Sequence, residues 1–328
     1  MDDFFKSVER FIADEIKPHI NAWDEAGEFP RDLYRQAGEM GLLGLGYPEA
    51  LGGFECTLAD RLRLSNLVCT AGSGGLLAGL FSHNIGLPPL LNHGDSALVE
   101  KIAPAVLRGE AISALAITEP SGGSDVANLK TTATLFDKAG VPYYRINGEK
   151  VFITSGVRAD WLTVAVRTGE PGARGISVLM VPGNSTGLTR SALKKTGWWM
   201  SDTASIHFNN VEVPATNLVG REGKGFRIIM ENFNTERLML AGACAGFSRV
   251  CLNEALDWAQ NRQTFGKRLM DHQVIAHKLA DMRMRIRATE AWFDETIARI
   301  DKGEVNEELV ADICLLKNQA TQTLQHCA

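Results

Sequence analysis

The chain has 328 residues, 45% of them hydrophobic, and a formal net charge of −5, which is enough material for a large core in two or three domains. The small negative charge and the lack of a basic patch interleaved with aromatic residues exclude nucleic acid as an expected partner. No stretch approaches the roughly 18 unbroken apolar residues of a membrane span, and the cysteines lack metal-ligand spacing, which indicates a reduced protein without a structural metal.

Residues 1–112 have a helical pattern. A first amphipathic helix is expected to stop near Pro18 and Gly27, and a second begins at Pro30. A loop and a helix rich in small residues follow, and a further helix is expected to close at Gly109. The acidic N-terminus resembles neither a secretory signal nor a mitochondrial transit peptide, so we expect a bacterial-type cytoplasmic protein.

From about Ala111 the hydrophobic period changes to two, which predicts a β domain. The segment "YYRINGEKVFITSG" is predicted to be a hairpin, in which Asn147 and Gly148 supply the positive φ angles of a type I′ turn. Further strands, bounded by Gly, Pro and Asn, are predicted in "DWLTVAVRTG", "GISVLMVPG" and "ASIHFNNVEVPA".

The helical period returns after the β domain and continues to the end of the chain, where no Gly, Pro or other stop signal appears. Three helices, at about 224–260, 270–302 and 306–328, would form an antiparallel bundle that ends inside a helix and is therefore incomplete. The predicted fold class is α+β and multidomain. Its parts are an N-terminal helical domain (1–112), a middle β-barrel or sandwich domain (113–217) and a C-terminal antiparallel helical bundle (218–328).

The first helix of this bundle contains an unusual pair of charges. Arg237 falls in the middle of the face that the pattern predicts to be buried, and Glu236 falls at its edge. Burying a charge is costly unless it is paired or its protonation shifts. Two interpretations remain open at this point: an ion pair that holds the helix in register, or a carboxylate with a raised pKa that abstracts a proton. The predicted buried face consists of Phe226, Ile229, Met230, Phe233, Leu240 and Phe247.

Two loops have the composition of cofactor sites. "LAITEPSGGSDV" at 115–126 offers hydroxyls and open backbone N–H groups for a phosphate or for the polar edge of a planar cofactor. "NRQTFGKRLMDHQ" at 261–273 gathers basic side chains and His272 around Phe265, which suits a diphosphate and an adenine. Taken alone, each loop is more often a plain connector. The common nucleotide signatures GxxxxGK[ST] and GxGxxG after a strand are absent.

The order and spacing of these motifs resemble the acyl-CoA dehydrogenase family over essentially the whole chain. The matching motifs are "GLLGLGYPEALGG", "AITEPSGGSD", "NGEKVFITSG", "SDTA", "R-TFGK-L-DHQ" and "LADM". The resemblance implies a flavoprotein with non-covalent FAD that converts an acyl-CoA to the trans-2-enoyl-CoA and passes electrons to an electron-transfer flavoprotein. It also implies a homo-oligomer, a dimer of dimers at full length.

The resemblance also assigns residues to the FAD. Thr118 would hydrogen-bond the edge of the flavin ring, and Phe152 stands where the family usually has Trp, so the aromatic face is kept but the indole N–H is not. The residues implied to bind FAD are Leu115, Thr118, Gly123, Ser124, Phe152, Ile153 and Thr154 around the ring, and Arg262, Thr264, Phe265, His272 and Gln273 at the pyrophosphate and adenine, commonly across a subunit interface.

The resemblance gives Glu236 a catalytic role. A subgroup that includes the isovaleryl- and long-chain-type enzymes carries its base in an "-ER" pair on the first long helix after the β domain, where Glu236 and Arg237 stand. Ser124, Asn234, Thr235 and Arg237 match positions that contact acyl-CoA, although Arg237 could equally be a counter-ion of Glu236.

The chain also departs from the family. It lacks the Gln-x-x-Gly-Gly loop that clasps the FAD of a neighbouring subunit. Two alternatives to a dehydrogenase remain: a flavin oxidase or monooxygenase of the same fold, which an Asp or a missing carboxylate in place of Glu236 would have favoured, and an inactive, truncated partner subunit, which the abrupt end at Ala328 would favour. The expectation of a medium-to-long or branched acyl group depends on the position of the base alone.

Overall fold

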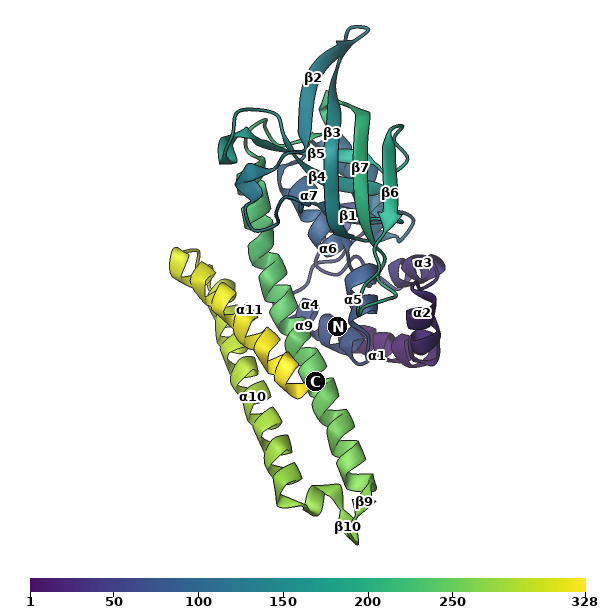
Figure 1. Cartoon of the computed structure of the whole chain (residues 1–328), viewed down its shortest axis with the longest axis vertical. Coiled ribbons are helices and arrows are strands. Elements are labelled where there is room, and N and C mark those ends of the chain that lie inside the picture. Colours follow the sequence, from purple (N-terminus) through teal and green to yellow (C-terminus); the bar gives the residue numbers. More distant parts are fainter. The chain divides into compact units, whose positions relative to one another are not determined.

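The computed structural model describes the whole chain, residues 1–328, and divides into two compact units. Unit 1 consists of residues 1–20, 56–73 and 234–328, and unit 2 of residues 21–55 and 74–233. Helices come first along the chain, strands follow and long helices end it (Figure 1), so the predicted α+β fold class is confirmed. The predicted domain boundaries stay a prediction, since each unit combines stretches that are far apart in sequence.

Unit 2 is built on an eight-stranded sheet with the order β6-β7-β3-β2-β4-β5-β8, in which β1 pairs with β4 in parallel. Most other neighbours are antiparallel, and β3 with β7 forms the longest ladder. The strands are β1 (Ser113–Ala116), β2 (Thr132–Lys138), β3 (Val141–Thr154), β4 (Trp161–Arg167), β5 (Ile176–Pro182), β6 (Leu188–Ala192), β7 (Thr203–Pro214) and β8 (Leu218–Val219).

One core cluster of unit 2 lies where helices pack on the part of the sheet that β4, β5 and β8 form. Leu90 of α7 and Ile102 of α8 join Val178 and Met180 of β5 in one buried cluster. Because β4 and β5 are buried on both faces, their sequences lack the alternation of an exposed strand. The helices that belong to this unit are α2 (Ile20–Ala26, all but its first residue), α3 (Asp32–Glu39), α5 (Gly74–Leu80), α6 (His83–Gly86), α7 (Pro88–His93) and α8 (Ser96–Leu107).

The predicted turn at Asn147 and Gly148 is wrong. Both residues lie inside β3, and the tight turn is instead formed by Ala139 and Gly140, with φ angles of 55° and 81°, between β2 and β3. Gly148 marks a register shift in the pairing of β3 with β7, and a Cβ there would lie 2.6 Å from the Thr131 Cα. The Asn-Gly signal therefore reports a close backbone approach rather than a chain reversal.

Unit 1 is mostly helical. The predicted stop near Pro18 is not a break, because a π-helical turn (Ile12–Ile16) and a 3₁₀ turn (Lys17–His19) carry the helical path through the proline. The predicted small-residue helix is two helices, separated at Gly72 with φ +84°. The elements of this unit are α1 (Asp2–Phe11), α4 (Leu58–Cys69), the part of α9 (Gly225–Asn261) that follows residue 233, β9 (Gln263–Thr264), β10 (Lys267–Arg268), α10 (Gln273–Asp301) and α11 (Glu307–Cys327).

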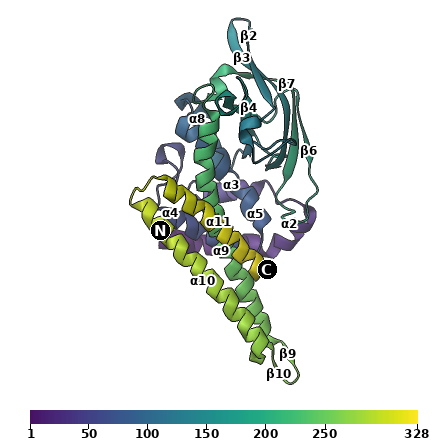
Figure 2. The ribbon, with the colours of Figure 1, turned by 60° about the vertical axis from the view of Figure 1, so that its left-hand side comes forward.

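The helices α9, α10 and α11 form the predicted bundle. A hairpin, β9–β10, joins α9 to α10, and α11 folds back along α10 (Figure 2). The core combines Leu238 and Cys244 of α9 with Phe293 of α10 and Leu316 of α11. One member of the predicted buried face is wrong, because the Leu240 side chain is exposed, at 37% of its full surface. Several neighbours contact α9, so the buried positions do not follow one stripe.

Candidate functional site

The loop after β1 forms the first part of the candidate site. Residues 119 and 122 exchange backbone hydrogen bonds, Glu119 N to Gly122 O at 3.2 Å and Gly122 N to Glu119 O at 3.0 Å, which closes a tight turn. A Cβ on Gly123 would lie 3.2 Å from the Thr118 Cγ2 atom, so a glycine lets the backbone approach this threonine closely. Leu115 and Thr118 are half-buried, whereas Gly123 and Ser124 are exposed.

The end of β3 lies directly against this loop. The Val151 backbone N–H donates to the Thr118 carbonyl at 2.9 Å, and the pairing of β3 with β7 is shifted between Lys150 and Ile153. Phe152 has a φ of +60° and its side chain is 69% exposed, so the backbone presents an aromatic ring to solvent. Ile153 is buried and its carbonyl accepts the Gly156 N–H at 3.0 Å, whereas Thr154 is half-buried.

An ion pair that the sequence reasoning missed joins these two segments. Lys150 Nζ donates to Glu119 Oε1 at 2.9 Å, and both side chains are almost fully buried. The sequence contains a signal for it, because Lys150 occupies an inward position of β3 that alternation assigns to an apolar residue. A buried lysine requires a partner, and Glu119 is the nearest acidic residue of the predicted cofactor loop.

A second group of predicted site residues lies on α9. Burial raises the pKa of Glu236 to about 7, although the charge of Arg237 lowers it. Arg237 Nη1 donates to the Asn234 Oδ1 atom at 3.0 Å, one helical turn away. Glu236, Asn234 and Arg237 are half-buried and Thr235 is exposed. A carboxyl that titrates near neutrality is suited to accept a proton.

The third group lies in the connection between α9 and α10. Phe265 and Gly266 form the turn of the β9–β10 hairpin with φ angles of 53° and 78°, and the Phe265 side chain is 97% exposed at its tip. The His272 Nε2 atom lies 3.2 Å from the Thr264 Oγ1 atom, and the ring centroids of Phe265 and His272 are 6.3 Å apart. Arg262 and Gln273 are exposed beside them.

The second and third groups are far apart in the same unit. At about 1.5 Å per residue, the helix from Glu236 to Asn261 is roughly 37 Å long. The β9–β10 hairpin follows the C-terminal end of α9 (Figure 1). The structure therefore gathers the predicted residues within each group and keeps these two groups apart.

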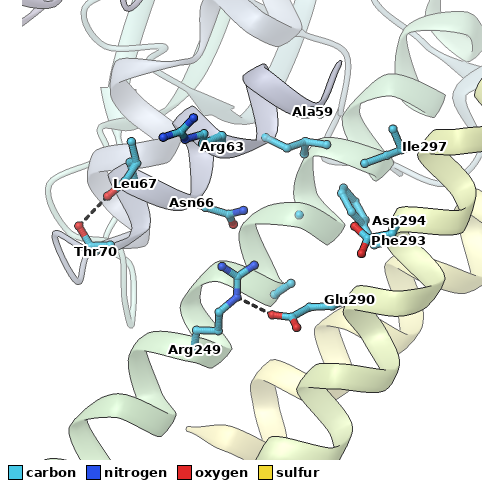
Figure 3. A pocket seen from close by; sticks show the side chains of 13 residues that line it. Ala59, Arg63, Asn66, Leu67, Thr70, Arg249, Glu290, Phe293, Asp294 and Ile297 are labelled. Atoms are coloured by element: carbon cyan, nitrogen blue, oxygen red, sulfur yellow. Dashed lines mark hydrogen bonds and ion pairs between the residues drawn. The ribbon is translucent and has the colours of Figure 1, made fainter. Parts of the chain in front are cut away.

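Unit 1 also contains a groove. It encloses about 370 Å³ between α4, α9 and α10, and none of the residues named above for FAD or acyl-CoA lines it. Arg249 of α9 and Glu290 of α10 line it and point toward each other (Figure 3), with the arginine Nε atom 2.6 Å from the Oε1 atom of the glutamate. No group of His, Cys, Asp and Glu side chains is arranged to hold a metal ion, and no helix is long and apolar enough to cross a membrane.

Comparison with protein families gives matches along almost the whole chain. Residues 2–110 match the acyl-CoA dehydrogenase N-terminal domain, residues 114–211 the acyl-CoA dehydrogenase middle domain, and residues 223–328 the acyl-CoA dehydrogenase C-terminal domain. The three matches follow one another along the chain, from residue 2 to residue 328, with only short gaps between them.

Individual relatives match nearly the whole of this chain and about four fifths of their own length. The mitochondrial isovaleryl-CoA dehydrogenase of Oryza sativa subsp. japonica is 33% identical over 327 residues, covering 98% of this chain and 78% of the relative. A crystal structure of a putative acyl-CoA dehydrogenase from Mycobacterium smegmatis has a TM-score of 0.94 and 41% identity, covering 98% of this chain and 84% of that one. The structure of a prolyl acyl carrier protein oxidase, AnaB, has a TM-score of 0.88 and 25% identity, with 98% and 84% coverage.

Proposed function

Because the chain belongs to the acyl-CoA dehydrogenase family, a family of flavoprotein oxidoreductases, we propose that it catalyses the FAD-dependent α,β-dehydrogenation of an acyl-CoA to the trans-2-enoyl-CoA. The resemblance found in the sequence motifs is thereby confirmed at the level of the family. The observation that carries the proposed mechanism is the carboxyl of Glu236, whose pKa burial raises to about 7.

Glu236 is the proposed base. An α proton of a thioester is weakly acidic, and a carboxylate with a pKa near neutrality accepts it more readily than one with the ordinary value. The carboxyl of Glu236 holds that proton, while Arg237 lies next to it and offsets part of the negative charge at neutral pH. Arg237 also binds Asn234, which fixes the guanidinium at one turn of α9.

The residues of unit 2 fit a flavin. Thr118 and the open turn at Gly122 and Gly123 provide a hydroxyl and backbone groups, and Phe152 provides an exposed ring held at a positive φ angle. We assign Leu115, Thr118, Gly123, Phe152, Ile153 and Thr154 to this cofactor, and Ser124 to both cofactor and thioester. FAD, when bound, supplies the acceptor for the hydride that leaves the β carbon of the acyl group.

The substrate contacts are proposed on the same basis. Asn234, Thr235 and Arg237 present an amide, a hydroxyl and a guanidinium within one turn of α9, all suited to the polar groups of coenzyme A. An electron-transfer flavoprotein is the proposed electron acceptor, and a medium-to-long or branched acyl group the proposed substrate. A cytoplasmic location stays a prediction.

A homo-oligomer is part of the proposal. Arg262, Thr264, Phe265, His272 and Gln273 are suited to a pyrophosphate and an adenine, but α9 holds them roughly 37 Å along the helix from Glu236. We propose that this hairpin completes the FAD site of a second copy of the chain. The 97% exposure of Phe265 supports this arrangement, because a large apolar side chain at a turn is suited to contact with a partner.

The proposed function is tested by anaerobic titration of the purified protein with a panel of acyl-CoAs, following the absorbance of oxidised flavin. Glu236→Gln removes the base while keeping size and polarity, so we expect bleaching in the wild type to be slowed about 10²- to 10⁴-fold in the variant. The matched control is Glu231→Gln on the same helix, whose carboxylate pairs with Arg227 and His93.

Three other outcomes would change the proposal. Equal bleaching rates in the wild type and Glu236→Gln would contradict the assignment of the base but keep the dehydrogenase. A colourless protein to which FAD does not bind would favour an inactive partner subunit. Substrate-dependent consumption of oxygen at the rate of turnover would favour a flavin oxidase, for which the likeness to the prolyl acyl carrier protein oxidase provides a precedent.

A further inference from the structure

The buried pair Lys150–Glu119 lies between the two segments that we assign to the flavin. Lys150 has no exposed surface, and its Nζ atom donates both to the Glu119 Oε1 atom and to the Ile117 carbonyl, each at 2.9 Å. Ile117 and Glu119 flank Thr118 on the loop after β1. One ammonium group therefore bonds the backbone carbonyl on one side of the threonine that is proposed to contact the flavin edge, and the side-chain carboxylate of the residue on its other side.

The other side of the pair anchors the start of β2. The Glu119 carboxylate accepts the backbone N–H groups of Lys130 at 2.6 Å and Thr131 at 2.9 Å, in addition to Lys150. Burial lowers the pKa of Lys150 to about 8, whereas the charge of Glu119 raises it. Burial raises the pKa of Glu119, but the charge of Lys150 and these hydrogen bonds lower it by more than burial raises it. The pKa of Glu119 therefore lies below its usual value.

The backbone beside Lys150 departs from the regular strand. Lys150 pairs with Ile206 of β7 and Ile153 with Ala204, so β3 contains one residue more than β7 over this interval. Within that bulge the Val151 N–H turns to the Thr118 carbonyl, and Phe152 takes its positive φ angle. The loop thus replaces β7 as the hydrogen-bond partner of β3 next to Lys150.

We propose that Lys150 and Glu119 are positioning residues that set the distance between Thr118 and the ring of Phe152, and thereby the geometry of the flavin site. The inference rests on the proposed function in one respect, the identity of the ligand between these segments. The alternative is that the pair stabilises the sheet without affecting the ligand. A single cluster bonds both flanks of Thr118, the start of β2 and the strand that carries Phe152, which favours positioning.

The test uses Glu119→Gln and the double variant Lys150→Met/Glu119→Gln. In the single variant an NH₂ group replaces one carboxylate oxygen and faces a donor, either the Lys130 N–H or the Thr131 N–H and Lys150. The double variant removes both charges, which avoids leaving one of them buried alone. The matched control is Glu212→Gln, which breaks exposed pairs of the same sheet with Lys138 and Arg145.

We expect the FAD dissociation rate to rise at least tenfold in both test variants, with a changed visible flavin spectrum and a fall in kcat that exceeds any change in KM. In the control variant Glu212→Gln, the FAD dissociation rate and kcat should stay within twofold of the wild-type values. Should the single variant fail to fold, the double variant decides. A folded double variant with a wild-type spectrum and FAD dissociation rate would overturn the proposal.

A readout that needs no flavin separates this inference from the proposed function. Amide hydrogen exchange of the flavin-free protein reports the Val151 and Thr131 N–H groups, which bond to Thr118 and Glu119. We expect at least tenfold faster exchange at both amides in the double variant than in the control. If the wild type binds no FAD, the proposed function fails while faster exchange still supports the coupling of loop and strand. Unchanged exchange at Val151 would overturn that coupling.

Discussion

Glu236 is the residue on which the proposed chemistry depends, and its environment explains why a helix buries a carboxyl. The group is half-buried on α9, and burial raises its pKa to about 7 against the opposing effect of Arg237. The two interpretations that the sequence left open, an ion pair and a base, differ in the protonation state at neutral pH. Burial outweighs the charge of Arg237, and the resulting pKa near neutrality is the property that the proposed base requires.

This pKa predicts an acid limb in the pH profile. The base acts only when deprotonated, so kcat/KM for an acyl-CoA should fall about tenfold per pH unit below pH 7 and level off above it. The measurement is kcat/KM between pH 5.5 and 8.5, in a range where FAD stays bound. A profile that is flat down to pH 5.5 would show that no group with a pKa near 7 controls the reaction.

At the scale of elements, β3 is the strand in which the local sequence pattern and the tertiary structure differ most. Asn147 and Gly148 have the composition of a hairpin turn, yet the strand continues through them, and Ala139 with Gly140 makes the turn. A local signal cannot tell a turn from a bulge, because both use a glycine with unusual φ. The pairing of β3 with β2 and β7 decided between them, and that pairing involves residues far away in sequence.

Substitution of the two glycines by alanine should separate these roles. Gly148→Ala is expected to lower the free energy of unfolding by about 2–4 kcal/mol, because its φ is +146° and the new Cβ would meet Thr131 backbone at 2.6 Å. Gly140→Ala is the matched control, with φ +81° and open space around the Cβ, and should cost only about 1–2 kcal/mol. Urea unfolding of both variants measures the difference. An equal loss of the free energy of unfolding in the two variants would contradict the close backbone approach at Gly148.

In the helix α9, too, the local sequence pattern predicts the element but not all of its contacts with distant residues. Its type and length were predicted closely, at about 224–260 against Gly225–Asn261. Its buried face was predicted in part, since Ile229 is buried but Leu240 is exposed, and Leu238 and Ala241 are buried instead. A helix with neighbours on several sides has no single apolar stripe, so periodicity alone misassigns some of its positions.

At the scale of the whole molecule, the chain forms two compact units, each assembled from distant stretches, and α9 contributes residues to both. The residues assigned to FAD are divided between the units, with the flavin-facing group in unit 2 and the hairpin group in unit 1. Each of the two groups can therefore be tested separately for its contribution to the proposed binding of FAD.

Added FAD should therefore stabilise the flavin-free protein. A ligand that binds only the folded state contributes about 2.7 kcal/mol at a concentration 100 times its dissociation constant, which corresponds to a rise in Tm of several degrees. Thermal unfolding with increasing FAD measures the shift, and riboflavin, which lacks the pyrophosphate and adenine, is the control ligand. A Tm that does not move at saturating FAD would contradict the cofactor proposal for this chain.

The sequence by itself determined the succession of helical, β and helical segments, the α+β fold class and, through motifs in a fixed order, the family. These follow from local periodicity and short motifs, which neighbouring residues carry. Only the tertiary structure decided that Gly148 lies in a bulge, that Leu240 faces solvent and that Lys150 pairs with Glu119 beside Thr118. The physical reason is that strand register, helix faces and buried ion pairs depend on contacts between residues distant in the chain, which no local pattern records.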